Sequence, residues 1–255
     1  MNGSVFGLLA SDDATLPDFA DRLDLSLTVP LAFGDANAQT REGRDQIAAN
    51  LDAVARGDYD DAYRRVARRL VDAGYGDAIV RLGHEFNGAW APWSSRTNED
   101  HFIAAWRHVH DVLSDEAPGL RFEWTALRPA WFEWGVAAYP GDDYVDIVGL
   151  DLYWRIQPRD DLWDPVEWER QFLRVMRDHH SFAVLHDKPV AYPEWGLQGG
   201  DAPQFIEAMH EWLGNLPEVG PGRLLYHSYF DSGNAYALDQ YPRSAATYQE
   251  LFGDS

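Results

Sequence analysis

Cysteine is absent from this chain of 255 residues, and lysine is nearly absent. Without cysteine the protein can form no disulfide, carry no thiol nucleophile and build no thiolate metal site, although this absence does not identify a compartment. Lys188 is the only lysine, so arginine supplies every other cationic side chain. An acidic, lysine-poor composition is consistent with a salty habitat, but biased codon usage would produce the same pattern.

Positive charge is scarce, because 21 basic residues stand against 42 acidic ones and give a net charge of −21. Such a field repels phosphate backbones and anionic lipid, so we expect neither a nucleic-acid nor a membrane partner. No apolar run reaches the roughly 18 residues that a membrane-spanning helix needs. The first residues also lack the basic and apolar regions of a secretory signal, so we expect either no export by that route or a trimmed chain.

Apolar, strand-like runs alternate with amphipathic helical stretches along the chain, and no linker-like shift in composition divides it. This alternation predicts an α/β fold with a parallel sheet, as one domain over residues 1–255. A (β/α)8 TIM barrel is the leading prediction, and a doubly wound open sheet is the alternative. The predicted strands are 5–9, 25–33, 78–84, 121–126, 145–153, 189–195 and 224–231, and the predicted helices are 60–73, 99–113, 165–177, 203–213 and 244–251.

The number of predicted strands leaves the start of the barrel open. If the strand over 189–195 is the seventh of a barrel's eight, the strand over 78–84 is the fourth, and three strands should precede it. Only two convincing ones do. Either a weak strand lies between Gly34 and Gly57, or the barrel lacks or modifies its first strand. An incomplete barrel would expose sheet edges, which a second copy of the chain could cover in a homo-oligomer.

Two glutamates follow apolar runs and stand beside tryptophans. Glu85 precedes Trp90 and Trp93 in one loop. Glu194 ends another apolar run, directly before Trp195. Indole rings offer large apolar faces on which a pyranose ring can stack, so an acid beside them is suited to protonating a sugar oxygen. Most glycoside hydrolases need two such acids for catalysis.

Active sites of α/β barrels gather at the C-terminal ends of the strands. Period-two alternation places Arg81 and Glu85 on one face of their strand, and Asp151 and Tyr153 on one face of theirs. Because parallel strands end at the same edge of the sheet, these side chains can converge with Glu194. The sequence therefore predicts a single pocket that both glutamates line.

A retaining mechanism needs two carboxyl groups about 5–5.5 Å apart in different environments. Glu85, between two tryptophans and a strand end, could have its pKa raised by desolvation, which suits the acid. Glu194 would need hydrogen-bond donors to stay ionised, and Tyr153 or Arg81 could supply them. The same alternation along the strand places Tyr192 on the face of Glu194.

Each candidate also has a purely structural interpretation. A single glutamate at a strand end is most often a surface or salt-bridged residue. His84 alternates away from Glu85 and could be a hydrogen-bonded packing histidine. Asp151 and Tyr153 could merely cap their strand. The two glutamates together, each followed by tryptophan and glycine, favour the functional interpretation.

No motif for a metal or a cofactor is recognisable in the sequence. His84 and Glu85 begin like the zinc-protease helix, but Gly88 stands in the place of its second histidine. No Walker loop, dinucleotide fingerprint or nucleophile elbow occurs. We therefore predict neither a metal site nor a cofactor.

Residues 84–93 resemble the acid/base motif of glycoside hydrolase family 26, the β-mannanase family of the retaining barrel clan. That motif usually reads His-Glu-Met-Asn-Gly, so Phe86 is a conservative departure. Residues 148–153 resemble the family's strand-six motif, in which the aspartate and the tyrosine border the site. Residues 188–196 are similar to its nucleophile strand. The resemblance extends from about Asp58 to the C-terminus and is strong as a set, because the three motifs occur in order.

The resemblance implies a role for each of these residues. Glu85 would be the acid/base, Glu194 the nucleophile and Tyr153 the hydrogen-bond partner of the nucleophile. His84 and Trp90 would line the subsite where cleavage occurs. These two residues and further neighbours of both acids make up the predicted substrate-binding set, which is His84, Trp90, Trp93, Asp151, Trp195 and Arg81.

The resemblance implies a retaining endo-acting glycoside hydrolase without a cofactor, acting on a polysaccharide or oligosaccharide. The localisation stays open: this class of substrate favours an extracellular one, but the sequence shows no signal peptide. β-1,4-Mannan is the best single substrate, with xylan and β-glucan as alternatives. Residues 124–129 depart from the family's usual pattern after strand five, and the region before Asp58 is short. Two rival hypotheses are a non-catalytic carbohydrate-binding protein derived from such an enzyme and an inverting glycosidase that uses the same carboxyl groups.

Overall fold

The computed structural model describes residues 4–5, 26–32, 35–128, 131, 135–155 and 163–253. The chain divides into two compact units, Met1–Gly149 and Leu150–Ser255, which are described separately. The boundary falls inside one strand, β5 (Ile147–Arg155). That residues 1–255 form a single catalytic domain stays a prediction. Across the described ranges, every helix is too short or too polar to traverse a bilayer.

The strands of the first unit pair in parallel and in chain order. β1 (Ser4–Val5) pairs with β2 (Ser26–Val29), and β2 pairs with β3 (Ile79–Leu82). β3 pairs in turn with β4 (Arg121–Leu127). This sequential order is that of a barrel, because a doubly wound sheet reverses its order at a switch point. The alternative of a doubly wound sheet is therefore wrong.

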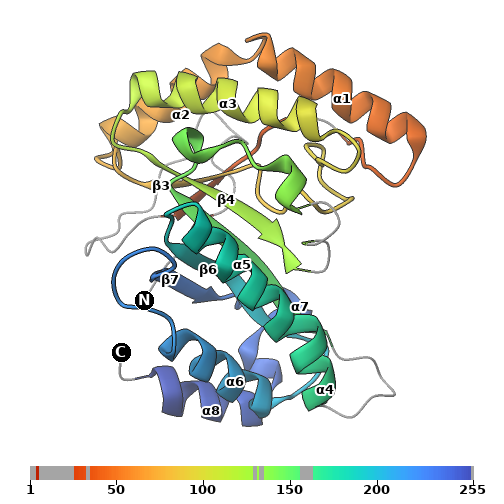
Figure 1. The fold of residues 1–255 in the computed structure, drawn as a ribbon, viewed down its shortest axis with the longest axis vertical. Coiled ribbons are helices and arrows are strands. Elements are labelled where there is room, and N and C mark those ends of the chain that lie inside the picture. The colour runs from red at the N-terminus through yellow and green to blue at the C-terminus, as the bar shows by residue number, and fades with distance from the viewer. Residues whose placement is uncertain are drawn as a thin grey trace. The chain divides into compact units, whose positions relative to one another are not determined.

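Three long helices belong to the first unit: α1 (Arg41–Ala55), α2 (Asp60–Asp72) and α3 (Glu99–Glu116). α3 packs against both of the others, and Figure 1 shows the three in one layer beside β3 and β4. The short helical turns Val136–Ala138 and Asp142–Tyr144 precede β5. Helices that follow and cover parallel strands are what the alternating sequence pattern predicts.

Helix α1 occupies the region in which a weak strand is one of the two expectations. No strand occurs among the described residues 35–57, so that expectation is wrong. The helix buries Ile47, Leu51 and Val54, which are spaced by four and three positions and so lie on one helical face. Thr40 caps its start, since its hydroxyl accepts the Gly43 N–H at 3.0 Å. A barrel that lacks its first strand stays a prediction.

The second unit continues the same arrangement with β5, β6 (Val190–Gln198) and β7 (Leu224–Tyr229), and β6 and β7 pair in parallel. In Figure 1, α6 and α8 lie side by side, and they pack on one another. The predicted helix over 165–177 is split by a π-helical segment. The helical elements are α4 (Pro165–Glu167), the π-helix Trp168–Leu173, α5 (Arg174–Leu185), α6 (Pro203–Gly214), α7 (Gly233–Tyr236), a 3-10 turn Leu238–Gln240 and α8 (Pro242–Phe252).

Every predicted strand has a counterpart in the structure, with bounds that differ by a few residues. The largest difference is at the first strand, of which residues 6–9 lie outside the described residues. The strands are found because buried parallel strands read as nearly continuous apolar runs, and all four residues of β3 are buried.

Candidate active site

Glu85 lies in a tight turn that begins where β3 ends. The strand stops at Leu82, and both Gly83 and Glu85 have left-handed backbone, with φ of 53° and 49°. Such a conformation costs a residue with a side chain roughly 1–2 kcal/mol, so other contacts must hold it. The predicted alternation from Arg81 to Glu85 is wrong, because these left-handed residues break the extended strand.

Hydrogen bonds to β4 hold this turn. The Glu85 N–H donates to the carbonyl of Thr125 at 2.9 Å, and the Glu85 carbonyl accepts the Gly88 N–H at 2.8 Å. The Asn87 amide donates to the carbonyl of Leu127 at 2.8 Å and accepts the Leu127 N–H at 2.7 Å. The turn is therefore tied to the same strand at two points.

The indole of Trp90 reaches the carboxylate of Glu85, with its N–H donating to Oε2 at 3.1 Å. Trp90 is 48% exposed, whereas Trp93 is only 7% exposed. Trp93 donates its indole N–H to the His84 carbonyl at 2.9 Å and meets the Trp90 ring edge-on, with centroids 6.1 Å apart. Trp90 thus presents a half-exposed ring that packs against Trp93 and His84.

A buried ion pair lies at the level of β3 and β4. Arg81 and Glu123 are both fully buried, and Arg81 Nε lies 3.3 Å from Glu123 Oε1. The Thr125 hydroxyl donates to the same oxygen at 2.5 Å. At Gly149 an added Cβ would come within 2.8 Å of Glu123 Oε1, so only glycine fits there. Arg81 is enclosed in this pair, contrary to its predicted place among the substrate-binding residues.

Sequence reasoning missed Glu123 and Thr125. The available signal was an acid inside an otherwise apolar strand, because Glu123 stands between Phe122 and Trp124. A carboxylate in a fully buried strand requires a cationic partner. Arg81 on the neighbouring strand, paired with Glu123 in register, is that partner.

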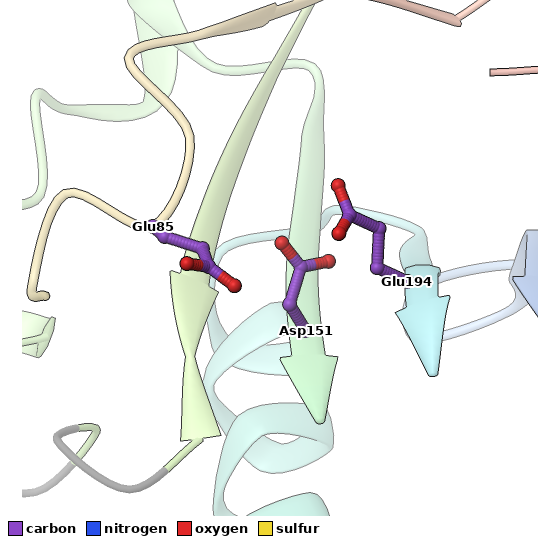
Figure 2. Close-up of side chains that lie close together, drawn as sticks. All are labelled: Glu85, Asp151 and Glu194. Carbon is purple, nitrogen blue, oxygen red and sulfur yellow. The ribbon is translucent and has the colours of Figure 1, made fainter. Parts of the chain in front are cut away.

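In the second unit, the Tyr153 hydroxyl donates to Glu194 Oε2 at 2.7 Å, which confirms the predicted contact. Asp151 and Glu194 are both buried. Their carboxylates come from neighbouring strands and offer oxygens within 4.8 Å of one another. Figure 2 shows Asp151 on β5 and Glu194 on β6 with their carboxylates turned toward each other, and it also draws Glu85 in the turn after β3.

Asp151 and Glu194 could both contribute oxygen ligands to a cation. Oxygen sites for Ca²⁺ take about six to eight ligands, so two carboxylates would supply only part of such a shell. Glu194 Oε2 already accepts the Tyr153 hydroxyl.

The ring of Tyr153 is oriented by aromatic neighbours that sequence reasoning also missed. Phe230 and Tyr236 meet it edge-on, with centroids at 5.7 Å and 5.0 Å. The Tyr236 hydroxyl in turn accepts the Gln198 side-chain N–H at 2.7 Å. These contacts fix the direction in which the Tyr153 hydroxyl donates. No spacing rule connects the residues, because they lie on different elements.

Strand β6 is irregular between Tyr192 and Trp195, where its register with β7 shifts. The Tyr192 hydroxyl accepts the Trp212 indole N–H of α6 at 2.8 Å, and Trp195 packs against Phe205 of the same helix. Both side chains are fully buried on the helix-covered face. The prediction that Tyr192 shares a face with Glu194 is therefore wrong. A buried Trp195 likewise offers no ring for a sugar, contrary to its predicted place.

Burial also shifts the pKa of groups around β6 and β7. It lowers the pKa of His227 to about 4, and the neutral ring accepts the Trp195 indole N–H at 3.3 Å. Burial raises the pKa of Tyr192 and of Tyr229 well above the usual range. These groups stay neutral at ordinary pH and act as packing and hydrogen-bonding residues.

Comparison with known proteins gives a family and relatives. The profile described as Glycosyl hydrolase family 26 matches residues 35–185. Mannan endo-1,4-beta-mannosidase A and B of Caldalkalibacillus mannanilyticus is 28% identical over 125 residues, which are 46% of this chain and 21% of that protein. Endoglucanase H of Acetivibrio thermocellus is 26% identical over 206 residues, 76% of this chain and 22% of that protein. The chain thus spans about a fifth of the length of these relatives.

Solved structures show the same fold. The GH26 β-mannanase BoMan26A of Bacteroides ovatus matches with a TM-score of 0.58 and 17% identity over 89% of this chain and 67% of that chain. A modular endo-β-1,4-mannanase of Cellulomonas fimi matches with a TM-score of 0.60 and 17% identity over 88% and 53%. Together with the sequential strand order, these matches confirm the predicted α/β barrel class.

Proposed function

Because the chain belongs to glycosyl hydrolase family 26, we propose that it is a retaining, endo-acting glycoside hydrolase that cleaves β-1,4-mannan outside the cell. Relatives from Caldalkalibacillus mannanilyticus and Bifidobacterium adolescentis carry the name mannan endo-1,4-beta-mannosidase, which supports mannan as the substrate. The relative named Endoglucanase H keeps β-glucan as the second candidate substrate. The net charge of −21 repels anionic polysaccharides and leaves neutral glycans as the fitting class.

The observation that carries the proposal is the way in which each glutamate is held. Glu85 follows strand β3, Glu194 lies within strand β6, and both side chains are nearly buried. Each accepts a hydrogen bond from an aromatic side chain, Trp90 in one case and Tyr153 in the other. Glycoside hydrolysis by two carboxyl groups requires that they have different environments, and here one accepts an indole N–H and the other a phenol hydroxyl.

In the proposed reaction Glu194 attacks the anomeric carbon, the glycosidic C–O bond breaks, and a covalent glycosyl-enzyme forms. Protonated Glu85 donates its proton to the departing oxygen. In the second step Glu85 takes a proton from water, the water oxygen attacks the anomeric carbon, and the Glu194 carboxylate leaves. The Tyr153 hydroxyl favours the ionised form of Glu194, because a donor stabilises the charged carboxylate.

We propose that Trp90 and His84 of the first unit and Asp151 of the second unit contact the sugar. The half-exposed Trp90 ring provides a stacking face, and His84 packs on it with ring centroids 5.7 Å apart. Asp151 lies beside the proposed nucleophile and can accept hydrogen bonds from sugar hydroxyls. Arg81 and Trp195 are excluded from this surface because both are fully buried.

The test is release of reducing ends from a panel of mannans, xylans and β-glucans, with Glu85→Ala and Glu194→Ala as inactive controls. We expect the wild-type protein to act on mannan and to produce internal chain breaks, seen as a rapid fall in viscosity. General acid catalysis contributes about 10²–10⁴-fold, so Glu85→Ala should lose at least that much on mannan. Binding of mannan without release of reducing ends would contradict the proposal and favour a carbohydrate-binding protein.

A further inference from the structure

The direction of the Glu85 carboxylate depends on a backbone turn whose left-handed conformation is unfavourable unless other contacts stabilise it. The backbone of Glu85 is left-handed, with φ of 49°, a conformation that residues other than glycine, asparagine and aspartate rarely adopt. Residues held in such a conformation persist only when their surroundings over-determine them. Whatever fixes this turn therefore also fixes the position of the proposed acid.

Asn87 makes the contact that replaces strand pairing beyond the end of β3. Its fully buried side chain bonds both backbone groups of Leu127, donating to the carbonyl at 2.8 Å and accepting the N–H at 2.7 Å. This continues the line of bonds along β4 that starts with Glu85 N–H to the Thr125 carbonyl. A primary amide, with a donor and an acceptor side by side, satisfies both groups as a backbone peptide would.

The same short segment places the aromatic donor of Glu85. Gly88 follows Asn87, and an added Cβ there would lie 2.7 Å from the Trp90 indole nitrogen. The indole therefore passes close over the backbone to reach the carboxylate. On its other side the Asn87 carbonyl accepts a bond from the Arg96 guanidinium at 2.8 Å, which fixes the return of the loop.

We propose that Asn87 is a positioning residue that acts through Glu85, by clamping the turn after β3 to the end of β4. The inference rests on the proposed function, in which Glu85 protonates the leaving oxygen. Displacement of a reacting group by about 1 Å can cost roughly 10²-fold in rate. Loss of the clamp should therefore weaken proton donation while leaving attack by Glu194 intact.

The leaving group separates this role from a merely structural one. A saccharide leaving group needs the proton, whereas 2,4-dinitrophenolate leaves without it. We expect Asn87→Ala and Asn87→Asp to lower kcat/KM for mannotetraose about 10²-fold, and to lower kcat/KM for 2,4-dinitrophenyl β-mannobioside no more than about threefold. The readout is the ratio of kcat/KM for mannotetraose to kcat/KM for the aryl glycoside. Because kcat/KM reports the first step, in which Glu85 donates its proton, this ratio measures proton donation.

Asn98→Ala is the matched control. Asn98 is also buried in the first unit, and its side chain donates to the Arg44 carbonyl at 3.1 Å, which lies outside the Glu85 turn. Its loss should leave the ratio of the two kcat/KM values unchanged. Asn87→Ser, which keeps one donor and one acceptor, extends the comparison if Asn87→Ala does not fold.

The outcomes distinguish the inference from the function on which it rests. Suppose that the wild-type protein hydrolyses both substrates and the Asn87 variants lose kcat/KM by the same factor on both. That result would overturn the positioning role of Asn87 but not the proposed function. A wild-type protein that hydrolyses neither substrate would overturn the proposed function, and the role of Asn87 with it. A selective loss on mannotetraose supports both.

Discussion

Glu194→Ala is expected to abolish hydrolysis of mannan, and added azide is expected to restore turnover with release of a glycosyl azide of inverted configuration. Removal of a covalent nucleophile costs on the order of 10⁵–10⁶-fold in kcat. The shortened side chain leaves space in which the small anion can attack the anomeric carbon directly, while Glu85 still donates the proton. Reducing-sugar assays measure the loss, and NMR of the anomeric proton identifies the azide product.

Two further variants give this experiment its controls. Glu207→Ala removes an exposed glutamate of α6 and should leave hydrolysis unchanged. Glu85→Ala, assayed with an activated aryl glycoside and azide, should release a glycosyl azide of retained configuration, because azide then attacks the glycosyl-enzyme. The two configurations assign the two glutamates to different steps. Turnover close to wild type in Glu194→Ala would refute the assignment.

Loss of one partner of the buried Arg81–Glu123 pair is expected to destabilise the protein by about 3–5 kcal/mol. Both side chains are fully buried and their charged atoms lie 3.3 Å apart, so Glu123→Gln removes a negative charge that faces the buried Arg81 guanidinium. Arg81→Met removes the positive charge that faces the buried Glu123 carboxylate. The change in free energy of unfolding is measured by urea denaturation with linear extrapolation.

A double-mutant cycle and an exposed pair supply the comparison. Arg81→Met combined with Glu123→Gln should cost less than the sum of the single changes, because neither charge is then left buried alone. The pair Arg170–Glu167 on the surface is 65% and 36% exposed, so Glu167→Gln should change stability by no more than about 1 kcal/mol. Additive single losses, each below about 1 kcal/mol, would contradict a buried ionic contact.

The fold could be predicted from the sequence because most of its strands, β7 excepted, are largely buried and read as apolar runs between helices. The sequence does not predict helix α1, because only Ile47, Leu51 and Val54 of its 15 residues form the buried apolar face. The two glutamates and Tyr153 could be located because strand ends are where barrel sites gather. Only the structure shows that Tyr153 donates to Glu194.

The errors at individual residues have local physical causes. Alternation along a strand fails where left-handed residues end it, as at Gly83 and Glu85, and where a strand is irregular, as between Tyr192 and Trp195. Neither the left-handed residues nor the strand irregularity can be recognised from the apolar pattern of the segment in which it occurs. The buried partner of Arg81 could not be assigned because it lies on another strand, and pairing between strands sets that contact.

The central claim, a covalent intermediate on Glu194 with Glu85 as its acid/base, is tested most directly by trapping that intermediate. Incubation with an activated 2-deoxy-2-fluoro mannoside slows the second step, so the glycosyl-enzyme accumulates. Mass spectrometry of the intact protein and of its peptides should show one added fluorosugar, attached to the peptide that contains Glu194. A protein that turns over mannan but yields no adduct, or carries it on another residue, would contradict the account.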